Sequence, residues 1–324
     1  GQTGQDIEYS AILVERDGFP DAVAGFVSDG GKGLNITVPF KEAAWELAAS
    51  HSPRAKRAGA VNTLLLAADG KHFGDNTDGA GLVRDLKHNH RCEIAGRRLL
   101  LVGAGGAARG VLEPLLAEHP ALLVIANRTA DKAIELARSF CELGRIEGCG
   151  LDDLEGHSFD IIINATAASL AGEVPALPVS IVTADCWCYD MMYGDQPTAF
   201  MEWARAQGAA RTLDGLGMLV EQAAEAFFSR DGIERTGVAK KSVNGLPAVV
   251  GTWSTTTRQG VIEGIASFVQ YDMTAARESS SCTIGRITTW AGASRGGMTS
   301  PSSSLWVMIS PPTSRVETPQ EVVH

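Results

Sequence analysis

The sequence predicts an α/β protein with two domains, a doubly wound parallel sheet covered by helices and a second, smaller α/β unit. Two observations in the middle of the chain predict the sheet. From residue 97 to residue 215, apolar runs alternate with amphipathic helical patterns, and a glycine-rich turn follows the first run. Such alternation is typical of parallel strands with a helix between each pair. A third observation, the length of 324 residues, favours two domains over one.

The strands of the larger domain are predicted from apolar runs. The candidates are residues 97–104, 122–127, 159–165, 184–190 and, more weakly, 211–213. Three of these runs are almost continuously apolar, as expected for strands buried on both faces. Helical patterns lie between them at 107–118, 131–143 and 197–207, and Pro114 is expected to bend or shorten the first helix.

The flanking segments predict the smaller unit. Its strand candidates are residues 8–14, 33–38 and 62–66, and its helices are 39–50 and 218–228. The second helix has apolar residues at 219, 220, 223, 224, 227 and 228, which is helical spacing. We therefore expect residues 1–79 with 215–237 to form one domain, residues 80–214 to form the other, and the functional cleft to lie between them.

Residues 238–324 differ in character from the rest of the chain. They are rich in Ser and Thr and close with Ser310-Pro311-Pro312-Thr313-Ser314. This composition favours loop or disorder over a packed domain. Residues 260–271 are compatible with a short helix or strand.

Composition limits the classes of partner. The net charge of −10, without a basic stripe, argues against a nucleic-acid surface, and no apolar run has the length of a membrane span. Six scattered cysteines without a C-x-x-C pair predict buried thiols in a reducing cytoplasm, and neither a disulfide framework nor a metal site. We expect a cytoplasmic protein that acts on a small molecule, with monomer and homodimer both left open.

The glycine-rich turn predicts a dinucleotide site of the Rossmann type. The strand at 97–102 leads directly into Gly103-Ala104-Gly105-Gly106-Ala107-Ala108-Arg109, a G-x-G-x-x-A turn that opens a helix. Gly103 permits the tight turn, Gly105 lets the backbone approach a pyrophosphate, and Ala108 allows close helix–strand packing. The phosphates would then contact free N–H groups at the helix N-terminus.

The end of the next strand favours NADP over NAD. An NAD site has an acidic residue there, which binds the ribose 2′-hydroxyl. This strand ends Asn127-Arg128-Thr129, with Lys132 one turn on, so a cationic fork stands where a carboxylate would repel a 2′-phosphate. Alternatively, Asn127 and Thr129 turn the chain and cap the helix, which is compatible with phosphate binding.

Six further motifs occur in a fixed order around this turn. They are N-I-T-V-P-F-K-E at 35–42, G-A-V-N-T at 59–63, G-D-N-T-D-G at 74–79, N-A-T at 164–166, Y-D-M-M-Y at 189–193 and D-G-L-G-M-L-V-E-Q-A at 214–223. Together they closely resemble the shikimate dehydrogenases of bacteria. The resemblance runs from about Gly1 to about Gly232.

The resemblance implies an activity and a set of site residues. It implies the reversible reduction of 3-dehydroshikimate to shikimate by NADPH, a step of chorismate and aromatic amino acid biosynthesis. Lys41 and Asp78 would be the catalytic pair, and Thr37, Asn62, Tyr193 and Gln222 would bind substrate. The implied cofactor-binding residues are Gly103, Gly105, Gly106, Ala107, Arg109, Asn127, Arg128, Thr129, Lys132, Met191 and Gly215.

The residue types fit this chemistry. Hydride addition to a ketone leaves negative charge on oxygen, which a positioned cation or proton donor stabilises. Lys41 can supply both, and Asp78 can hold the ammonium group. Pairing favours the charged lysine and burial opposes it, so the sequence leaves its protonation state open.

Each of these residues also has an ordinary structural explanation. A lysine after Pro-Phe is usually solvated, and Asp78 and Asn62 suit turns. Gln222 suits an exposed helix position, and Tyr193 suits the edge of a core.

The chain departs from the family pattern at both ends. It begins after the family's Gly-Asn-Pro-Ile-x-His-Ser-x-Ser-Pro segment, whose serines hold the substrate carboxylate; Ser279–Ser281 and Ser302–Ser304 lack the flanking residues that would restore it. From Ile233 onward the family's closing helix is not matched. We expect weaker substrate binding than in an intact enzyme, retained NADP binding, and an exposed sheet edge in the smaller domain.

Two other functions remain open, a non-catalytic NADP-binding derivative and a related dehydrogenase that uses quinate or NAD. The Asn127-Arg128-Thr129 end of the strand counts against NAD. Methylenetetrahydrofolate dehydrogenases have a similar two-domain plan, but that class does not account for the motifs at 75–79 and 214–223.

Overall fold

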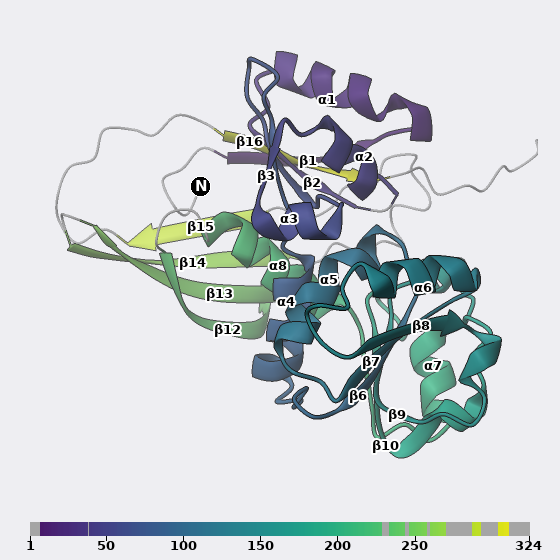
Figure 1. The fold of residues 1–324 in the computed structure, drawn as a ribbon. Coiled ribbons are helices and arrows are strands. Elements are labelled where there is room, and N and C mark those ends of the chain that lie inside the picture. The colour runs from purple at the N-terminus through teal and green to yellow at the C-terminus, as the bar shows by residue number, and fades with distance from the viewer. Residues whose placement is uncertain are drawn as a thin grey trace, which may run out of the picture.

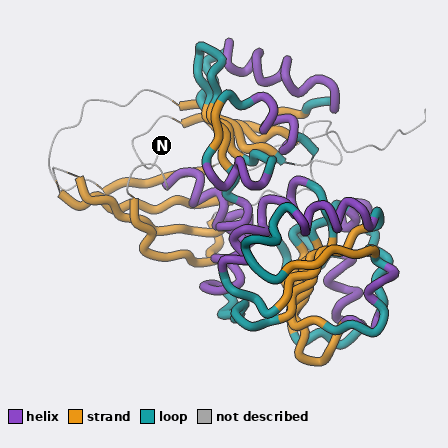
Figure 2. Tube along the Cα trace, viewed as in Figure 1, coloured by secondary structure: helices purple, strands orange, loops and turns teal. Residues whose placement is uncertain are grey.

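The computed structural model describes residues 7–37, 39–228, 233–243, 246–257, 260–269, 287–292 and 304–310. Within these residues the strands form three sheets, two of six strands and one of four. Figure 1 shows the two six-stranded sheets in separate bodies, with helices α4 and α8 between them, and Figure 2 shows the strands gathered in three groups.

The six-stranded sheet of the larger domain has the doubly wound order. Its strands are β6 (Arg98–Val102), β7 (Leu122–Asn127), β8 (Ile146–Gly150), β9 (Phe159–Asn164), β10 (Val182–Asp190) and β11 (Arg211–Leu213). The spatial order β11-β10-β9-β6-β7-β8 is parallel throughout. Numbered from β6, it reads 3-2-1-4-5-6 from β8 to β11, with the reversal between β6 and β9. The predicted fold class is confirmed.

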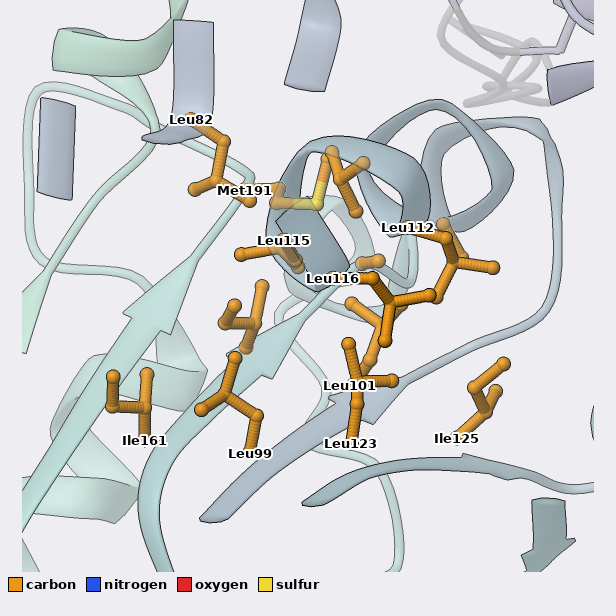
Figure 3. Close-up of a cluster of buried hydrophobic side chains, with 14 of the residues drawn as sticks. Leu82, Leu99, Leu101, Leu112, Leu115, Leu116, Leu123, Ile125, Ile161 and Met191 are labelled. Carbon is orange, nitrogen blue, oxygen red and sulfur yellow. The ribbon is translucent and has the colours of Figure 1, made fainter. Parts of the chain in front are cut away.

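Helix α5 (Gly106–Ala117) anchors the glycine turn to this sheet. Figure 3 shows Leu112, Leu115 and Leu116 of α5 above apolar side chains of β6, β7 and β9. Leu82 and Met191 join the same buried cluster, so the core includes residues of the segments that begin at Asp78 and follow Asp190. The helix runs through Pro114 to Ala117, so the proline does not end it.

The remaining helices of this domain are α6 (Ala130–Arg138) and α7 (Ala199–Ala206). The predicted helix at 131–143 ends early, and strand β8 follows it. We did not predict β8, because Ile-Glu-Gly-Cys-Gly is a short, half-buried edge strand with two glycines, a residue that is depleted in strands.

The smaller six-stranded sheet is mixed. Its strands are β1 (Ile7–Leu13), β2 (Gly33–Ile36), β3 (Ser50–His51), β4 (Thr63–Leu65), β5 (Phe73–Asp75) and β16 (Ser304–Ser310). The order is β1-β16-β2-β4-β5-β3. Strand β16 pairs in parallel with both β1 and β2, as Figure 1 shows in yellow between two purple strands. The sheet edge that we expected to be exposed is therefore paired, because unpaired backbone groups at an edge accept an additional strand.

Three helices belong to this sheet: α1 (Phe19–Ser28), α2 (Lys41–Leu47) and α3 (Pro53–Ala58). Short 3-10 turns lie at Arg16–Gly18, Asp152–Leu154, Ala168–Ala171 and Val179–Ile181, and a π turn at Asp85–Asn89 continues α4.

Helices α4 (Asp78–Arg84) and α8 (Leu216–Phe228) connect the two bodies. Helix α4 packs on both α5 and α8. A Cβ atom at Gly79 would lie 2.5 Å from the carbonyl oxygen of Gly110, and one at Gly81 would lie 2.7 Å from the backbone nitrogen of Gln222. These two glycines therefore permit the close packing that places the first residue of α4 beside α8.

Strands β12 (Ile233–Val243), β13 (Leu246–Thr257), β14 (Gly260–Val269) and β15 (Ile287–Gly292) form an antiparallel sheet. The predicted loop or disorder across 238–324 does not hold for these strands or for β16. Their Val, Ile, Thr and Trp residues favour strands, and that preference outweighs the high Ser content. The closing Pro311-Pro312-Thr313-Ser314 lies outside the described residues.

No described helix has the length and apolar character needed to cross a bilayer.

Candidate active site

The Lys41–Asp78 ion pair is the centre of the candidate site. Lys41 is the first residue of α2 and Asp78 is the first residue of α4. Lys41 Nζ lies 2.6 Å from Asp78 Oδ2, and the two side chains are 12% and 5% exposed. A pair this short and this shielded from water is held more tightly than an exposed surface pair.

Asn62 joins this pair to α8. Its Nδ2 lies 2.9 Å from each of three oxygen atoms, Thr77 Oγ1, Asp78 Oδ1 and Gln222 Oε1. The two N–H hydrogens of Nδ2 are shared among these three acceptors, and the Thr77 hydroxyl also lies 3.1 Å from Gln222 Oε1, to which it can donate. Asn62 Oδ1 accepts the backbone N–H of Thr77 at 3.0 Å, which fixes the amide orientation.

The structure thus brings together four of the predicted site residues, from α2, the segment before β4, α4 and α8. Asn62 and Gln222 are buried, which answers the turn and exposed-helix explanations for them. Thr37 directly follows β2 and its carbonyl oxygen accepts the N–H of Phe40. Tyr193 is half-buried in the loop after β10. Among the described residues, no hydrogen bond links the Thr37 side chain to the Lys41–Asp78 pair.

A charged network that we did not predict lies behind this site. Arg54 of α3 donates from Nε and Nη2 to the two carboxylate oxygens of Asp75, at 2.8 and 2.7 Å. Its Nη1 donates to Glu225 of α8 at 2.8 Å, and Arg84 of α4 pairs with the other oxygen of Glu225. Ser52 also donates to Asp75, at 2.6 Å.

This network keeps its carboxylates charged. Burial opposes the charge of Asp75, but hydrogen bonds from Arg54 and Ser52 hold the pKa of Asp75 below its ordinary value. The pKa of Glu225 is lowered in the same way, with burial opposing and Arg54 and Arg84 prevailing. Nothing in the local sequence marks such a network, because its members lie far apart in the chain.

The glycine turn lies against Lys41 of the Lys41–Asp78 pair. Gly103 has φ +112°, a conformation that L side chains rarely adopt, and its N–H donates to Ala126 O at 2.8 Å. A Cβ atom at Gly106 would lie 3.4 Å from Lys41 Cβ and 3.6 Å from Ala60 Cβ. The N-terminus of α5 therefore packs directly against Lys41.

Two features of this turn fit an anionic group. Arg109 Nε in the first turn of α5 is buried without a hydrogen-bond partner among the described residues. A Cβ atom at Gly105 would meet nothing within 4 Å, so the space beside this backbone is open. A buried guanidinium nitrogen without a partner among the described residues, together with the N–H groups at a helix N-terminus, suits the pyrophosphate of a dinucleotide.

The end of β7 is arranged as the NADP prediction requires. Asn127 Nδ2 donates to Thr129 O at 3.0 Å, which shapes the turn. Arg128, Thr129 and Lys132 are exposed. Thr129 is the N-cap residue of α6 but makes no side-chain capping bond. The turn explanation thus holds for Asn127, while Arg128 and Lys132 remain available to a phosphate.

Met191 and Gly215 meet at the carboxyl end of β10. A Cβ atom at Gly215 would lie 2.2 Å from Met191 O, so only glycine permits this approach. The preceding Asp190 accepts hydrogen bonds from Asn164, Ser169, Thr198 and the N–H of Met192. Burial raises the pKa of Asp190 above its ordinary value. These contacts fix the backbone of the segment that carries Met191 and Tyr193.

The described residues contain no group of three or more His, Cys, Asp or Glu side chains that could hold a metal ion.

Comparisons with known proteins fall on the same two regions. A model of the shikimate dehydrogenase substrate-binding domain matches residues 1–64, and a model of shikimate/quinate 5-dehydrogenase matches residues 85–171. The shikimate dehydrogenase (NADP(+)) of Cellvibrio japonicus is 59% identical over 227 residues, which cover 70% of this chain and 82% of that protein.

Solved structures give the same result. The Ael1 enzyme from Pseudomonas putida superposes with a TM-score of 0.60 at 47% identity, covering 67% of this chain and 79% of that one. Shikimate 5-dehydrogenase from Thermus thermophilus, in complex with NADP(H) and shikimate, superposes with a TM-score of 0.56 at 31% identity. That match covers 66% of this chain and 78% of the other.

Proposed function

The chain belongs to the shikimate dehydrogenase family, and from this premise we propose that it catalyses the reversible reduction of 3-dehydroshikimate to shikimate by NADPH. One observation carries the proposal. The Lys41–Asp78 pair, Asn62 and Gln222 converge at one place, opposite the glycine turn that begins α5. Polar groups for a hydroxylated ring and a phosphate-binding turn thus face the same cleft.

Lys41 is the proposed proton donor. NADPH, when bound, supplies the hydride that adds to the ketone carbon of the substrate. Lys41 packs against the start of α5. Its Nζ stabilises the negative charge on the former ketone oxygen and gives it a proton. In the reverse direction Lys41 Nζ accepts the hydroxyl proton of shikimate.

Asp78 positions Lys41 and contacts the ring. Its Oδ2 accepts from Lys41 and its Oδ1 accepts from Asn62, so both oxygens are fixed before substrate arrives. A carboxylate held this way accepts a hydrogen bond from a ring hydroxyl without reorganisation, which lowers the barrier to reaction.

Neutral side chains account for recognition of the ring hydroxyls. Asn62 and Gln222 are buried, and Thr37 lies at the end of β2. A buried polar group loses its partner when an analogue lacks the matching hydroxyl, so such sites discriminate strongly against deoxy analogues. Tyr193 is proposed to approach the substrate from the loop after β10.

The cofactor is assigned to the glycine turn and the end of β7. Gly103, Gly105, Gly106, Ala107 and Arg109 are proposed to hold the pyrophosphate. Asn127, Arg128, Thr129 and Lys132 are proposed to hold the adenosine 2′-phosphate. Met191 and Gly215 are proposed to contact the nicotinamide half.

The cellular location and the oligomeric state of the chain are also proposals. Soluble substrate and cofactor suit a cytoplasmic enzyme, and we propose a monomer or a homodimer. Sedimentation velocity of the purified chain distinguishes the two.

A steady-state assay of the purified chain tests the function. NADPH formation is followed with shikimate and NADP⁺, and then with quinate or NAD⁺ as replacements. We expect turnover with shikimate and NADP⁺, and a lower kcat/KM for each replacement. NADPH binding without turnover of either acid would instead establish a non-catalytic cofactor-binding protein.

A further inference from the structure

Arg54 bridges β5, which ends three residues before Asp78, and α8, which carries Gln222. Its Nε and Nη2 hold both oxygens of Asp75 at the end of β5, and its Nη1 holds Glu225 on α8. Arg54 lies on α3, which contributes none of the proposed site residues. The proposed chemistry does not use this guanidinium.

In both segments, the carboxylate that Arg54 binds lies three positions from the site residue. Asp78 follows Asp75 by three residues, and Gln222 precedes Glu225 by three residues on α8. The side chains of Asp78 and Gln222 meet at Asn62 Nδ2, each at 2.9 Å. One guanidinium therefore fixes the separation of two segments, 75–78 and 222–225, whose site residues converge at Asn62.

From this geometry we propose that Arg54 is a positioning residue of the candidate site, which sets the distance between Asp78 and Gln222 by clamping Asp75 to Glu225. The catalytic consequences rest on the proposed function, whereas the geometric consequence does not.

Other hydrogen bonds of Asp75 link the Arg54 clamp to residues of the candidate site. The N–H of Asn62 donates to Asp75 O at 3.0 Å, and the N–H of Asn76 donates to Asp75 Oδ1 at 2.8 Å. A shift of Asp75 would therefore move Asn62 and the turn before Asp78 together. On the other side, Arg84 ties α4 to the same Glu225 carboxylate, and α4 begins with Asp78.

The planar fork of arginine is required for this arrangement. Two parallel N–H bonds to Asp75 and a third to Glu225 need donors in a fixed plane. A lysine at position 54 keeps the charge but offers one ammonium nitrogen, so it cannot hold both carboxylates in the same geometry. Arg54→Lys therefore keeps the positive charge and removes the simultaneous contact with Asp75 and Glu225.

The variants Arg54→Lys and Glu225→Gln test the role, with Arg57→Gln as the control. Arg57 lies on the same helix α3, but its ion pair with Glu142 lies on the surface. The measurements are kcat, KM for shikimate, KM for NADP⁺ and the melting temperature. We expect Arg54→Lys to raise KM for shikimate and to lower kcat/KM by about ten-fold or more, because small misplacements at a reacting centre are costly. KM for NADP⁺ stays unchanged, and Arg57→Gln behaves as the parent chain.

A purely structural role gives a different result. If Arg54 only stabilises the fold, its loss lowers the fraction of active enzyme, so kcat falls while both KM values stay constant. That outcome, or parental kinetics in Arg54→Lys, overturns the proposal.

A crystal structure of Glu225→Gln or Arg54→Lys gives a readout that needs no activity. We expect Gln222 Oε1 to move out of hydrogen-bond reach of Asn62 Nδ2. An unchanged contact in both variants overturns the inference. An inactive parent chain would reject the proposed function, and the crystal structures would still decide the role of Arg54.

Discussion

The two parts of the candidate site, one proposed for the substrate and one for the cofactor, are built in opposite ways. On the substrate side, Asp78, Asn62 and Gln222 are buried and already bonded to one another. On the cofactor side, Gly105 and Arg128 are exposed, and Arg109 Nε is buried without a partner among the described residues. The first side is preorganised by side chains, whereas the second consists of backbone and cations that a ligand completes. Changes on the first side should therefore affect turnover, and changes on the second should affect cofactor affinity.

The largest expected effect follows from removing the ammonium group of the substrate side. Lys41→Ala, or Asp78→Asn, should lower kcat by about 10²- to 10⁴-fold, because a positioned proton donor contributes that much. The Kd for NADPH, measured by fluorescence titration, should stay nearly unchanged. Lys56→Ala, which changes an exposed lysine of α3, is the matched control. Full turnover in either site variant would reject the catalytic assignment.

A smaller effect is expected from the exposed cation at the end of β7. Arg128→Ala should raise the Kd for NADPH by about ten- to a hundred-fold, because hydrogen bonds to a charged group are lost. The Kd for NADH, which has no 2′-phosphate, should not change. Calorimetric titration with both cofactors gives the ratio of the two Kd values. An equal loss of affinity for NADPH and NADH would show that Arg128 does not bind the 2′-phosphate.

Substitutions of Gly103 and of Gly105 should differ in their effect on thermal stability. Gly105→Ala meets no protein atom within 4 Å, so its melting temperature should equal that of the parent. Its Kd for NADPH should rise by roughly ten-fold, because a methyl group would occupy the space beside the pyrophosphate. Gly103→Ala should lose thermal stability as well, since Gly103 has φ +112° and Thr166 would lie 3.2 Å away. Equal melting temperatures for the two variants would contradict this distinction.

The smallest expected effect concerns acid stability. The pKa values of Asp75 and Glu225 lie below their ordinary values, so these groups stabilise the fold at neutral pH. This contribution is lost as the pH falls through the ordinary glutamate value of 4.5 toward the lowered one. Glu225→Gln lacks one titrating group, so its melting temperature should fall less steeply below that pH, by on the order of a few °C. Calorimetry across the acid range measures the slope, and parallel slopes would refute the prediction.

Asp190 provides the opposite case on the cofactor side. Burial raises its pKa, so any stability linked to its protonated form is present below the ordinary aspartate value and is lost as the pH rises through the raised one. Of these three carboxylates, Asp75 and Glu225 stabilise the fold above the acid range, and Asp190 does the opposite.

The fold was predictable where strands are buried on both faces. Leu99, Leu100 and Leu101 are fully buried, and such continuous apolar runs identified the central strands of the large sheet. Prediction failed for β8 and for the strands after Ile233, where polar or small residues conceal the pattern. The contribution of β16 to the smaller sheet could not be predicted, because no local signal specifies pairing between distant strands.

The candidate site was predictable only in part, for a similar reason. The motif residues Lys41, Asp78, Asn62 and Gln222 do converge, as the family resemblance implied. The Arg54 clamp was missed because Arg54 and Glu225 are 171 residues apart and neither occurs in a recognisable motif. Thr37 and Tyr193 stay predictions, since their roles depend on a substrate.

The position of β16 has a consequence for the order of folding. Every strand of the large sheet lies between Arg98 and Leu213, so its pairings join residues that are closer together in the chain. The smaller sheet pairs Ile7 with Ser304 and Gly33 with Trp306, which are contacts of very high sequence separation. Such contacts form slowly, because a long loop must close first. During synthesis, the cofactor domain can therefore form before β16 is available to pair with β1 and β2.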